Sequence, residues 1–323
     1  MTNPIVKIQA KFPDTLQLTW ILNNICTNKC SYCIPELYAG KNHHYEWDNA
    51  KIFVELLLEK YKNIHCNISG GEPTMSPFMI ELAKKFYDNG HTAGITSNGV
   101  RTVKYFTKLS KYLNYIVFSY HPEYGDANEL IEKSKACIGN CKTHISVMMH
   151  PHYWDETVEY YEKICEIPYI DAIAVRIHDR DQKDKSTAEY TKEQLNWFEH
   201  KNNVVNNLSE FYIDNNPPNL GSNFILQDNT VVNDARPVEF MSKGQIYFKD
   251  WSCNAGLESL FVNTHGVVYK ANCTIGGSIG SINKPYEVNW PTQPVLCDGR
   301  RCDCSPDYNI SKYNTNLKLS YEP

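Results

Sequence analysis

The sequence predicts an α/β fold in which a partial TIM-like (β/α)6 barrel is followed by a small C-terminal domain. Two observations support this prediction. Six short strands alternate with helical segments over roughly the first 200 residues, and each strand ends in a polar or glycine-containing segment. Eight of the twelve cysteines then fall into two clusters, at residues 26–33 and 253–304, one in each predicted domain.

The predicted strands are separated by segments in which apolar residues recur at helical spacing. The strands are 16–23, 64–68, 92–97, 115–120, 144–149 and 172–177, and the helices between the first four strands lie near 52–61, 77–89 and 101–111. The first helix, for example, places Phe53 and Leu57 on one face. Strands that alternate with helices form a parallel sheet, whose crossovers pack the helices on its outer face.

The last three predicted strands alternate polar and apolar side chains, whereas strands buried on both faces are continuously apolar. By the two-residue period of a strand, Ser119 and His121 oppose Phe118 and Tyr120. The other positions assigned to the polar face are His144, Ser146, Met148 and His150 in the fifth strand and Ala174, Arg176 and His178 in the sixth, opposite Ile173, Val175 and Ile177. We expect this face to line a ligand cavity. A sheet with one face open to water is the alternative.

Composition and charge restrict the class of protein. The 323 residues carry a formal net charge of −5 with a pI near 6.1, and no run of Lys or Arg is present, so nucleic acid and anionic membranes are not expected partners. The first residues lack the apolar core of a signal peptide, and no apolar run approaches membrane-spanning length. We therefore expect a cytoplasmic protein, in which clustered cysteines indicate metal chemistry in preference to disulfides.

Three thiols occur within eight residues, Cys26, Cys30 and Cys33, in the loop after the first predicted strand. Thiolates favour zinc, copper(I) or iron–sulfur clusters, and structural zinc normally takes four closely placed ligands. Iron–sulfur clusters also take four protein ligands as a rule, so three thiols would leave one iron open. A zinc knuckle or three unrelated core thiols remain the alternatives.

The CxxxCxxC spacing, with aromatic Tyr32 before the third cysteine, resembles that of the radical SAM enzymes, and a Gly-Gly-Glu segment ends the second predicted strand, as in that family. The resemblance implies a 4Fe–4S cluster on Cys26, Cys30 and Cys33, with S-adenosylmethionine (SAM) chelated to its open iron. By the same resemblance, the residues that contact SAM or the substrate are Tyr32, Gly70, Gly71, Glu72, Pro73, Ser97, Asn98 and Ser119, with Arg176 for the SAM carboxylate.

The C-terminal third holds the second thiol cluster, Cys253, Cys273, Cys297, Cys302 and Cys304. A hairpin at 259–262 and 267–270 lies between the first two of these cysteines, and this arrangement resembles the SPASM/twitch extension of radical SAM enzymes. The resemblance implies one auxiliary 4Fe–4S cluster on Cys253, Cys273 and two of the last three thiols; zinc is the alternative. We expect domains at 1–205 and 206–323, joined through the polar segment 215–219.

The function that the resemblance implies is reductive cleavage of SAM to a 5′-deoxyadenosyl radical, which abstracts hydrogen from a substrate in the polar cavity. We expect His121, His150 and His178 to act on a polar small molecule, with oxidation or rearrangement assisted by the auxiliary cluster and with electrons from a flavodoxin or ferredoxin. Only 25 residues precede Cys26, which argues against a leader-binding domain. Maturation of a ribosomal peptide is one alternative, and a non-catalytic electron-transfer or zinc scaffold protein is another.

Overall fold

The computed structural model describes residues 3–40, 44–177, 189–201, 221–235, 237–241, 244–299, 301–302 and 305–315. The chain forms two compact units, each built from separate stretches. Unit 1 comprises Met1–Leu22, His44–Asn67 and Pro217–Pro323, and unit 2 comprises Asn23–His43 and Ile68–Asn216. The predicted domain boundary at 205/206, the segment 215–219, His178 and Cys304 lie outside the described residues, and the division into two domains at that boundary stays a prediction.

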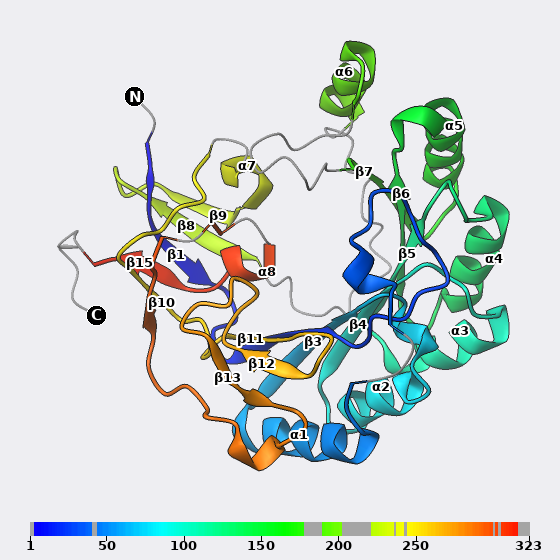
Figure 1. The fold of residues 1–323 in the computed structure, drawn as a ribbon. Helices are drawn as coiled ribbons and strands as arrows, with labels where there is room; N and C mark the ends of the chain where they lie inside the picture. Colours follow the sequence, from blue (N-terminus) through cyan, green and yellow to red (C-terminus); the bar gives the residue numbers. More distant parts are fainter. Residues whose placement is uncertain are drawn as a thin grey trace. The chain divides into compact units, whose positions relative to one another are not determined.

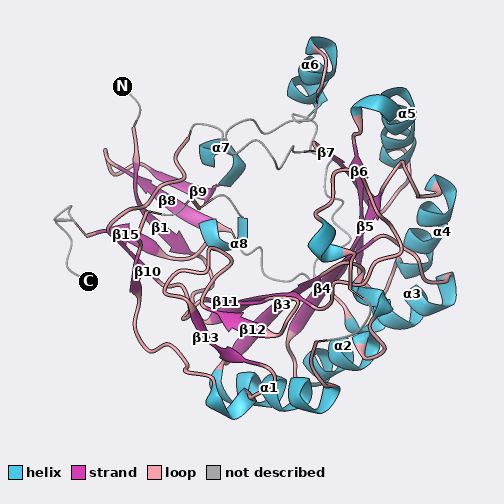
Figure 2. Cartoon of the chain, in the orientation of Figure 1, coloured by secondary structure: helices cyan, strands magenta, loops and turns pink. Residues whose placement is uncertain are grey.

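The described helices alternate with strands over the first two thirds of the chain, as predicted (Figure 2). The α-helices are α1 (Trp47–Lys60), α2 (Met79–Asp88), α3 (Val103–Leu109), α4 (Ala127–Cys137), α5 (Trp154–Cys165), α6 (Lys192–Lys201), α7 (Pro237–Met241) and α8 (Ser305–Tyr308). Short 3-10 helices include η2 (Pro73–Met75) and η4 (Pro151–Tyr153). The three helices predicted between the first four strands are therefore confirmed as α1, α2 and α3.

The strands of the first two thirds match the six predicted segments within about two residues. They are β2 (Thr15–Ile21), β3 (Asn63–Ser69), β4 (Thr92–Ser97), β5 (Tyr115–Tyr120), β6 (Lys142–Met148) and β7 (Ile170–Val175). In unit 2 the strands run in the order β4-β5-β6-β7, and every pair is parallel. The predicted α/β class, with the open strand–helix alternation of a partial barrel, is confirmed.

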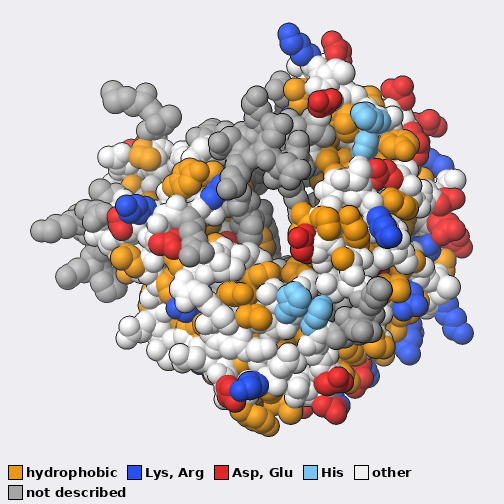
Figure 3. All heavy atoms as spheres, viewed as in Figure 1, with side chains coloured by type: hydrophobic (Ala, Val, Ile, Leu, Met, Phe, Trp, Pro, Cys, Tyr) orange, Lys and Arg blue, Asp and Glu red, His pale blue; other side chains and the backbone are white. Residues whose placement is uncertain are grey.

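One face of the unit 2 strands is covered by helices α2 to α5 (Figure 1). Phe118 of β5 is fully buried there and meets Phe106 of α3 edge-on at 4.9 Å between ring centroids. Ile116, Ile145 and Val147 are also fully buried, as apolar residues on the helix-facing side should be. The charged outer surfaces of these helices carry interspersed Lys, Arg, Asp and Glu side chains (Figure 3), so the visible face has no basic patch.

The face assignment predicted for the sixth strand is wrong. In the parallel register, Ser119 of β5 pairs with Ser146 of β6, and Ser146 pairs with Ile173 of β7. Ile173 therefore lies on the polar face, where 43% of it is exposed, and Ala174 lies beside Val147 on the helix-facing side. The sequence misleads here because β7 has no strong alternation and its neighbours alone decide its register.

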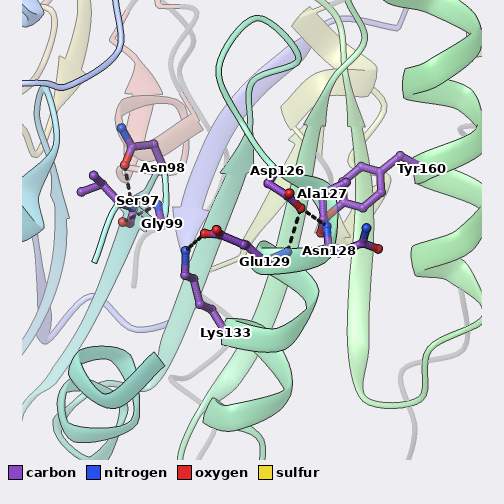
Figure 4. A network of polar contacts seen from close by, with 10 residues as sticks. Ser97, Asn98, Gly99, Asp126, Ala127, Asn128, Glu129, Lys133 and Tyr160 are labelled. Atoms are coloured by element: carbon purple, nitrogen blue, oxygen red, sulfur yellow. Dashed lines mark hydrogen bonds and ion pairs between the residues drawn. The ribbon is translucent and has the colours of Figure 1, made fainter. Parts of the chain in front are cut away.

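Helix α4 begins at an N-capping network that also includes a hydrogen bond from α5 (Figure 4). The Asp126 carboxylate accepts hydrogen bonds from the backbone N–H groups of Asn128 (2.8 Å) and Glu129 (3.1 Å), as an N-cap residue should. The Tyr160 hydroxyl of α5 donates to the Ala127 carbonyl at 2.8 Å. These bonds tie α4 and α5 together at the end of β5.

Unit 1 contains two strand systems. One has the order β14 (Val295–Leu296), β10 (Trp251–Cys253), β15 (Lys312–Asn314), β1 (Ile5–Ala10), β8 (Ser222–Leu226) and β9 (Val231–Ala235). The other joins β13 (Ser278–Ser281), β12 (Val267–Tyr269), β11 (Ser259–Val262), β2 and β3. The antiparallel hairpin β11–β12 confirms the predicted one.

Strand β1 has no counterpart among the predicted strands. It pairs antiparallel with both β8 and β15, which are more than 200 residues away in the chain. Its Ile5 and Ile8 enter an apolar cluster with Phe224, Trp251 and Tyr308. A six-residue strand at the N-terminus finds its partners only in the tertiary structure, so local pattern did not reveal it.

Candidate iron–sulfur sites

Cys26, Cys30 and Cys33 lie in a loop that closes on itself directly after β2. An antiparallel bridge joins Ile25 to Ala39, and the N–H of Gly40 donates to the carbonyl of Asn24 at 2.9 Å. Inside this closure, the N–H of Cys33 donates to the carbonyl of Cys30 at 2.9 Å, which forms a tight turn between the last two thiols. The predicted loop conformation is therefore set by backbone hydrogen bonds at both ends.

The Gly-Gly-Glu segment holds this loop by its backbone. The N–H groups of Gly71 and Glu72 donate to the carbonyls of Asn23 (2.8 Å) and Ile25 (2.7 Å). A Cβ on Gly71 would lie 2.2 Å from the Leu37 carbonyl oxygen and 2.6 Å from that of Ile25. Glycine is therefore required at position 71 because two stretches of the chain pass close to each other there, a reason that is not evident from the sequence.

The Glu72 side chain is fully buried and accepts four hydrogen bonds. Its Oε1 accepts from the N–H of Thr74 (2.9 Å), the hydroxyl of Thr74 (2.6 Å) and the hydroxyl of Ser97 (2.9 Å), and its Oε2 accepts from the N–H of Asn98 (2.6 Å). Burial raises the pKa of this carboxyl, while the four donors lower it. Pro73 follows at the start of η2, where its missing N–H costs no hydrogen bond.

Asn98 connects Glu72 to the first thiol. Its backbone N–H binds Glu72, and its side-chain Nδ2 donates to Cys26 Sγ at 3.6 Å. The N–H of Asn28 donates to the same sulfur at 3.4 Å. Burial raises the pKa of Cys26, and these two donors oppose the increase because they stabilise the thiolate, which is the form that binds metal. The sequence-predicted residues Glu72, Ser97, Asn98 and Cys26 therefore form one continuous hydrogen-bonded chain.

The second thiol is deeply enclosed. Burial first, and then the charges of Glu123, Cys33 and Cys26, raise the pKa of Cys30 to about 12. A positively charged soft metal centre would offset this increase, because coordination deprotonates a thiol outright. The donor set thus fits a cluster. In the described part of the chain, no group of three or more His, Cys, Asp or Glu side chains is already placed so that it could hold a metal ion.

The segment after β5 clamps the middle of the cysteine loop. The Tyr32 hydroxyl lies 2.8 Å from His121 Nδ1, and Glu123 Oε2 accepts from the N–H of Ser31 at 2.8 Å. The Tyr124 hydroxyl donates to the Lys29 carbonyl at 3.0 Å. Burial lowers the pKa of His121 to about 4, so its imidazole is neutral at pH 7 and can accept a hydrogen bond from the Tyr32 hydroxyl. Sequence analysis did not include Glu123 or Tyr124 among the site residues.

His150 approaches the same clamp from the end of β6. Its ring centroid is 5.8 Å from that of Tyr32, and its Nε2 lies 4.0 Å from Glu123 Oε1. Its Nδ1 accepts from the N–H of His152 at 3.1 Å, which caps η4 and fixes the ring. The structure therefore brings two of the three predicted catalytic histidines to Tyr32. Ser119, buried on β5, pairs in register with Ser146 on the polar face.

Arg176 is placed differently from its predicted position. It follows β7, and its guanidinium carbon lies 5.2 Å from the centroid of the Phe198 ring in α6. The Arg176 Nε is buried without a hydrogen-bond partner. Because β7 is turned relative to the prediction, the assignment of Arg176 to the SAM carboxylate gains no support from this packing and stays a prediction.

Four of the five C-terminal thiols surround one pocket in unit 1. Its empty volume is about 410 Å³, and its lining consists of Phe248, Cys253, Ala255, Ala271, Cys273, Ile275, Cys297, Cys302, Asp307, Ile310 and Lys312. The walls are apolar apart from the thiols, one carboxylate and one ammonium. Thiols from the ends of β10 and β14, from the loop after β12 and from the segment before α8 thus meet although they span about 50 residues of sequence.

Buried carboxylates hold the thiol-bearing segments in place. Asp307 accepts from the N–H groups of Asn272 (3.0 Å) and Cys273 (2.7 Å). Glu258 accepts from Asn254 Nδ2 (2.7 Å) and from the N–H of Ser311 (2.8 Å). Burial raises the pKa of the Cys302 thiol to about 11, and the Lys312 ammonium opposes this increase. Hydrogen bonds to buried carboxylates therefore hold the segments that carry Cys253 and Cys273.

Comparisons with known proteins agree with the geometry of unit 2. Residues 20–126 match the model of the radical SAM superfamily. Mycofactocin maturase MftC of Mycobacterium tuberculosis is 32% identical over 119 residues, which are 34% of this chain and 29% of that protein. GTP 3′,8-cyclase of Haemophilus ducreyi is 28% identical over 89 residues, which are 25% of each chain. These alignments thus span less than a third of the length of either relative.

A solved structure extends the similarity of fold to most of the chain. Native anSMEcpe with bound AdoMet has a TM-score of 0.50 and 14% sequence identity, over 85% of this chain and 81% of that one. At this identity the match shows the fold alone. In the described part of the chain, no helix is both long and apolar enough to span a membrane.

Proposed function

We propose that this chain is a radical SAM enzyme of the SPASM/twitch type, because its residues 20–126 match the model of the radical SAM superfamily. Cys26, Cys30 and Cys33 would hold the SAM-binding 4Fe–4S cluster. When bound, the cluster and SAM supply a 5′-deoxyadenosyl radical that takes a hydrogen atom from the substrate. The observation that carries the proposal is the hydrogen-bonded chain from Glu72 through Asn98 to Cys26, which links the two family motifs.

The protein's own residues would position and shield the reacting groups. Glu72 joins the segment after β3 to the end of β4, and these bonds would hold Gly70, Gly71, Pro73 and Ser97 in place for SAM binding. Tyr32, locked to His121, would stand against the SAM adenine or the substrate. In this arrangement His121 would act through Tyr32 as a positioning residue, in place of the direct substrate contact that its position at a strand end suggested.

The substrate that the site favours is a polar small molecule. Ser119, Ser146 and the partly exposed His150 lie on the polar face of β5 and β6, and Glu123 lies next to His150. Hydroxyl, amine or phosphate groups would find partners there. A second candidate is a ribosomally made peptide, because the relative with 32% identity is named a maturase. A short precursor-peptide gene beside this gene would favour the second candidate.

We further propose that Cys253, Cys273, Cys297 and Cys302 hold one auxiliary 4Fe–4S cluster. These four described thiols would suffice for one cluster, which takes four protein ligands as a rule. An auxiliary cluster suits a net oxidation, since it would accept the electron left on the product radical and return it to a flavodoxin or ferredoxin in the cytoplasm. A Cys304→Ser variant should keep the iron of this site, whereas Cys273→Ser should lose it.

Anaerobically reconstituted protein tests the function directly. Reduced with dithionite and supplied with SAM, it should release 5′-deoxyadenosine slowly even without substrate, and the Cys26/Cys30/Cys33→Ala variant should release none. Intact SAM in the presence of a bound, reduced cluster would refute the enzyme and favour an electron-transfer protein. Iron–sulfur absorbance that persists in the triple variant supports the auxiliary cluster, and zinc alone in that variant refutes it.

A further inference from the structure

Lys312 is a buried lysine that faces the thiol pocket of unit 1. Only 3% of it is exposed, although lysine is almost never fully buried unless its charge is compensated. It lies on β15, where it pairs directly with Cys253 of β10 in the antiparallel register. Its ammonium therefore lies among the thiols that would bind the auxiliary cluster.

The Lys312 ammonium makes three hydrogen bonds. It donates to the carbonyl of Asp307 at 2.7 Å, to the carbonyl of Tyr308 at 3.3 Å and to Cys302 Sγ at 3.5 Å. An ammonium has three N–H groups, so the sulfur receives the third donor. The Nζ atom also lies 4.9 Å and 5.5 Å from the ring centroids of Phe248 and Tyr308, where cation–π attraction stabilises the charge.

The carboxylate of Asp307 does not accept a hydrogen bond from the Lys312 ammonium. Both carboxylate oxygens of Asp307 accept from the N–H donors of the Asn272–Cys273 segment, and only its main-chain carbonyl accepts from Lys312. A purely structural lysine could cap the two carbonyls from many directions. The geometry observed sends the remaining N–H and the positive charge toward a cysteine sulfur.

From this arrangement, which rests on the auxiliary cluster proposed above, we propose that Lys312 is a positioning residue that raises the reduction potential of that cluster. Reduction adds one negative charge to a cluster, and a neighbouring cation stabilises the reduced form more than the oxidised form. Hydrogen bonds to cluster sulfurs, net charge and burial are the features by which proteins set this potential. At Cys302, Lys312 supplies a hydrogen bond to the sulfur and a buried positive charge.

Redox titration of the cluster, followed by electron paramagnetic resonance, tests the proposal. The Cys26/Cys30/Cys33→Ala variant isolates the auxiliary signal in the full-length chain. In that background, Lys312→Met should lower the potential by about 59 mV or more, which is a tenfold shift of a one-electron equilibrium. Lys312→Arg, which keeps charge and donors, should stay closer to the parent. Lys270→Met removes a lysine that does not line the pocket and should leave the potential unchanged.

A second measurement needs no substitution of Lys312. Protein labelled with nitrogen-15 at lysine Nζ should show a hyperfine coupling between the Lys312 nitrogen and the reduced auxiliary cluster. An unchanged potential in Lys312→Met, or the absence of the coupling in the labelled protein, would overturn the role of Lys312 while leaving the cluster in place. Failure of iron to bind in the triple variant would instead refute the auxiliary cluster, and the role of Lys312 with it.

Discussion

The Tyr32 hydroxyl lies 2.8 Å from Nδ1 of His121, so the aromatic residue between Cys30 and Cys33 is hydrogen-bonded to the residue that follows β5. The ring of His121 also stacks on that of Tyr32, with centroids 5.9 Å apart and 21° between the planes. Together with the Glu123–Ser31 hydrogen bond, this pair fixes the cysteine loop between its two backbone closures. The arrangement gives His121 a role that its position at a strand end did not reveal.

Removing the Tyr32 hydroxyl should loosen the loop without removing the ring. In Tyr32→Phe we expect a loss of about 1 kcal/mol, the usual net value of one neutral hydrogen bond. The cluster should still assemble but release iron several-fold faster to a chelator, measured by absorbance under anaerobic conditions. Tyr87→Phe, at a 57% exposed position, is the matched control. Equal release rates in the two variants would contradict the clamp.

Gly71 should not tolerate even one methyl group. In Gly71→Ala the new Cβ meets the carbonyl oxygens of Leu37 and Ile25, so the backbone of the cysteine loop must shift. We expect a loss of about 3 kcal/mol, at the upper end for overpacked sites, and a lower iron content after reconstitution.

Gly90→Ala provides the control for Gly71→Ala. Gly90 has a φ of +75° and open space around it, so alanine there costs only the left-handed conformation, about 1 kcal/mol. Urea denaturation measures both losses, and iron analysis should separate them, since only the Gly71 variant displaces the loop. Normal iron content in Gly71→Ala would show that the loop adapts.

Glu72 should be sensitive to an isosteric change. Both oxygens of Glu72 accept hydrogen bonds. In Glu72→Gln, an NH₂ group replaces one of these oxygens, so a donor faces a donor. We expect a loss of about 2 kcal/mol from an unmatched buried group, together with weaker SAM binding by equilibrium dialysis. Glu156→Gln, at the Tyr120 hydroxyl, changes a hydrogen-bonded carboxylate in the same unit and should leave SAM binding intact.

Acid should destabilise the protein partly through His65. Burial lowers the pKa of this histidine to about 4, and only 2% of it is exposed. The unfolded chain, with a pKa near 6.5, takes up the proton first as pH falls. The stability that the neutral imidazole contributes is therefore complete above about pH 6.5 and is lost between about pH 6.5 and 4, a change of about 3 kcal/mol.

Replacing the titrating group tests this pH dependence. His65→Gln should flatten the loss of unfolding free energy between pH 6.5 and 4 in denaturant titrations at several pH values. His152→Gln, at an exposed histidine, should keep the acid sensitivity of the parent protein. An identical pH profile in His65→Gln and the parent would assign the sensitivity to other groups, such as His121.

Local pattern determined much of this protein. The spacing of Cys26, Cys30 and Cys33, the Gly-Gly-Glu segment at the end of β3, and the strand–helix alternation all follow from neighbours within about ten residues, where periodicity and turn chemistry decide the structure. For this reason six strands, three helices, the hairpin β11–β12 and the similarity of residues 20–126 to the radical SAM superfamily were predictable without coordinates.

Only the tertiary structure decided which distant residues meet. The register of β7 depends on β6, and it turned Ile173 toward the polar face against the predicted alternation. Three other contacts join segments that share no local pattern, namely those of β1 with its partner strands, of Glu123 with Ser31, and of Lys312 with Cys302. Such contacts form because a whole unit must bury its apolar surface and satisfy its buried polar groups at once, a condition that no short stretch of sequence records.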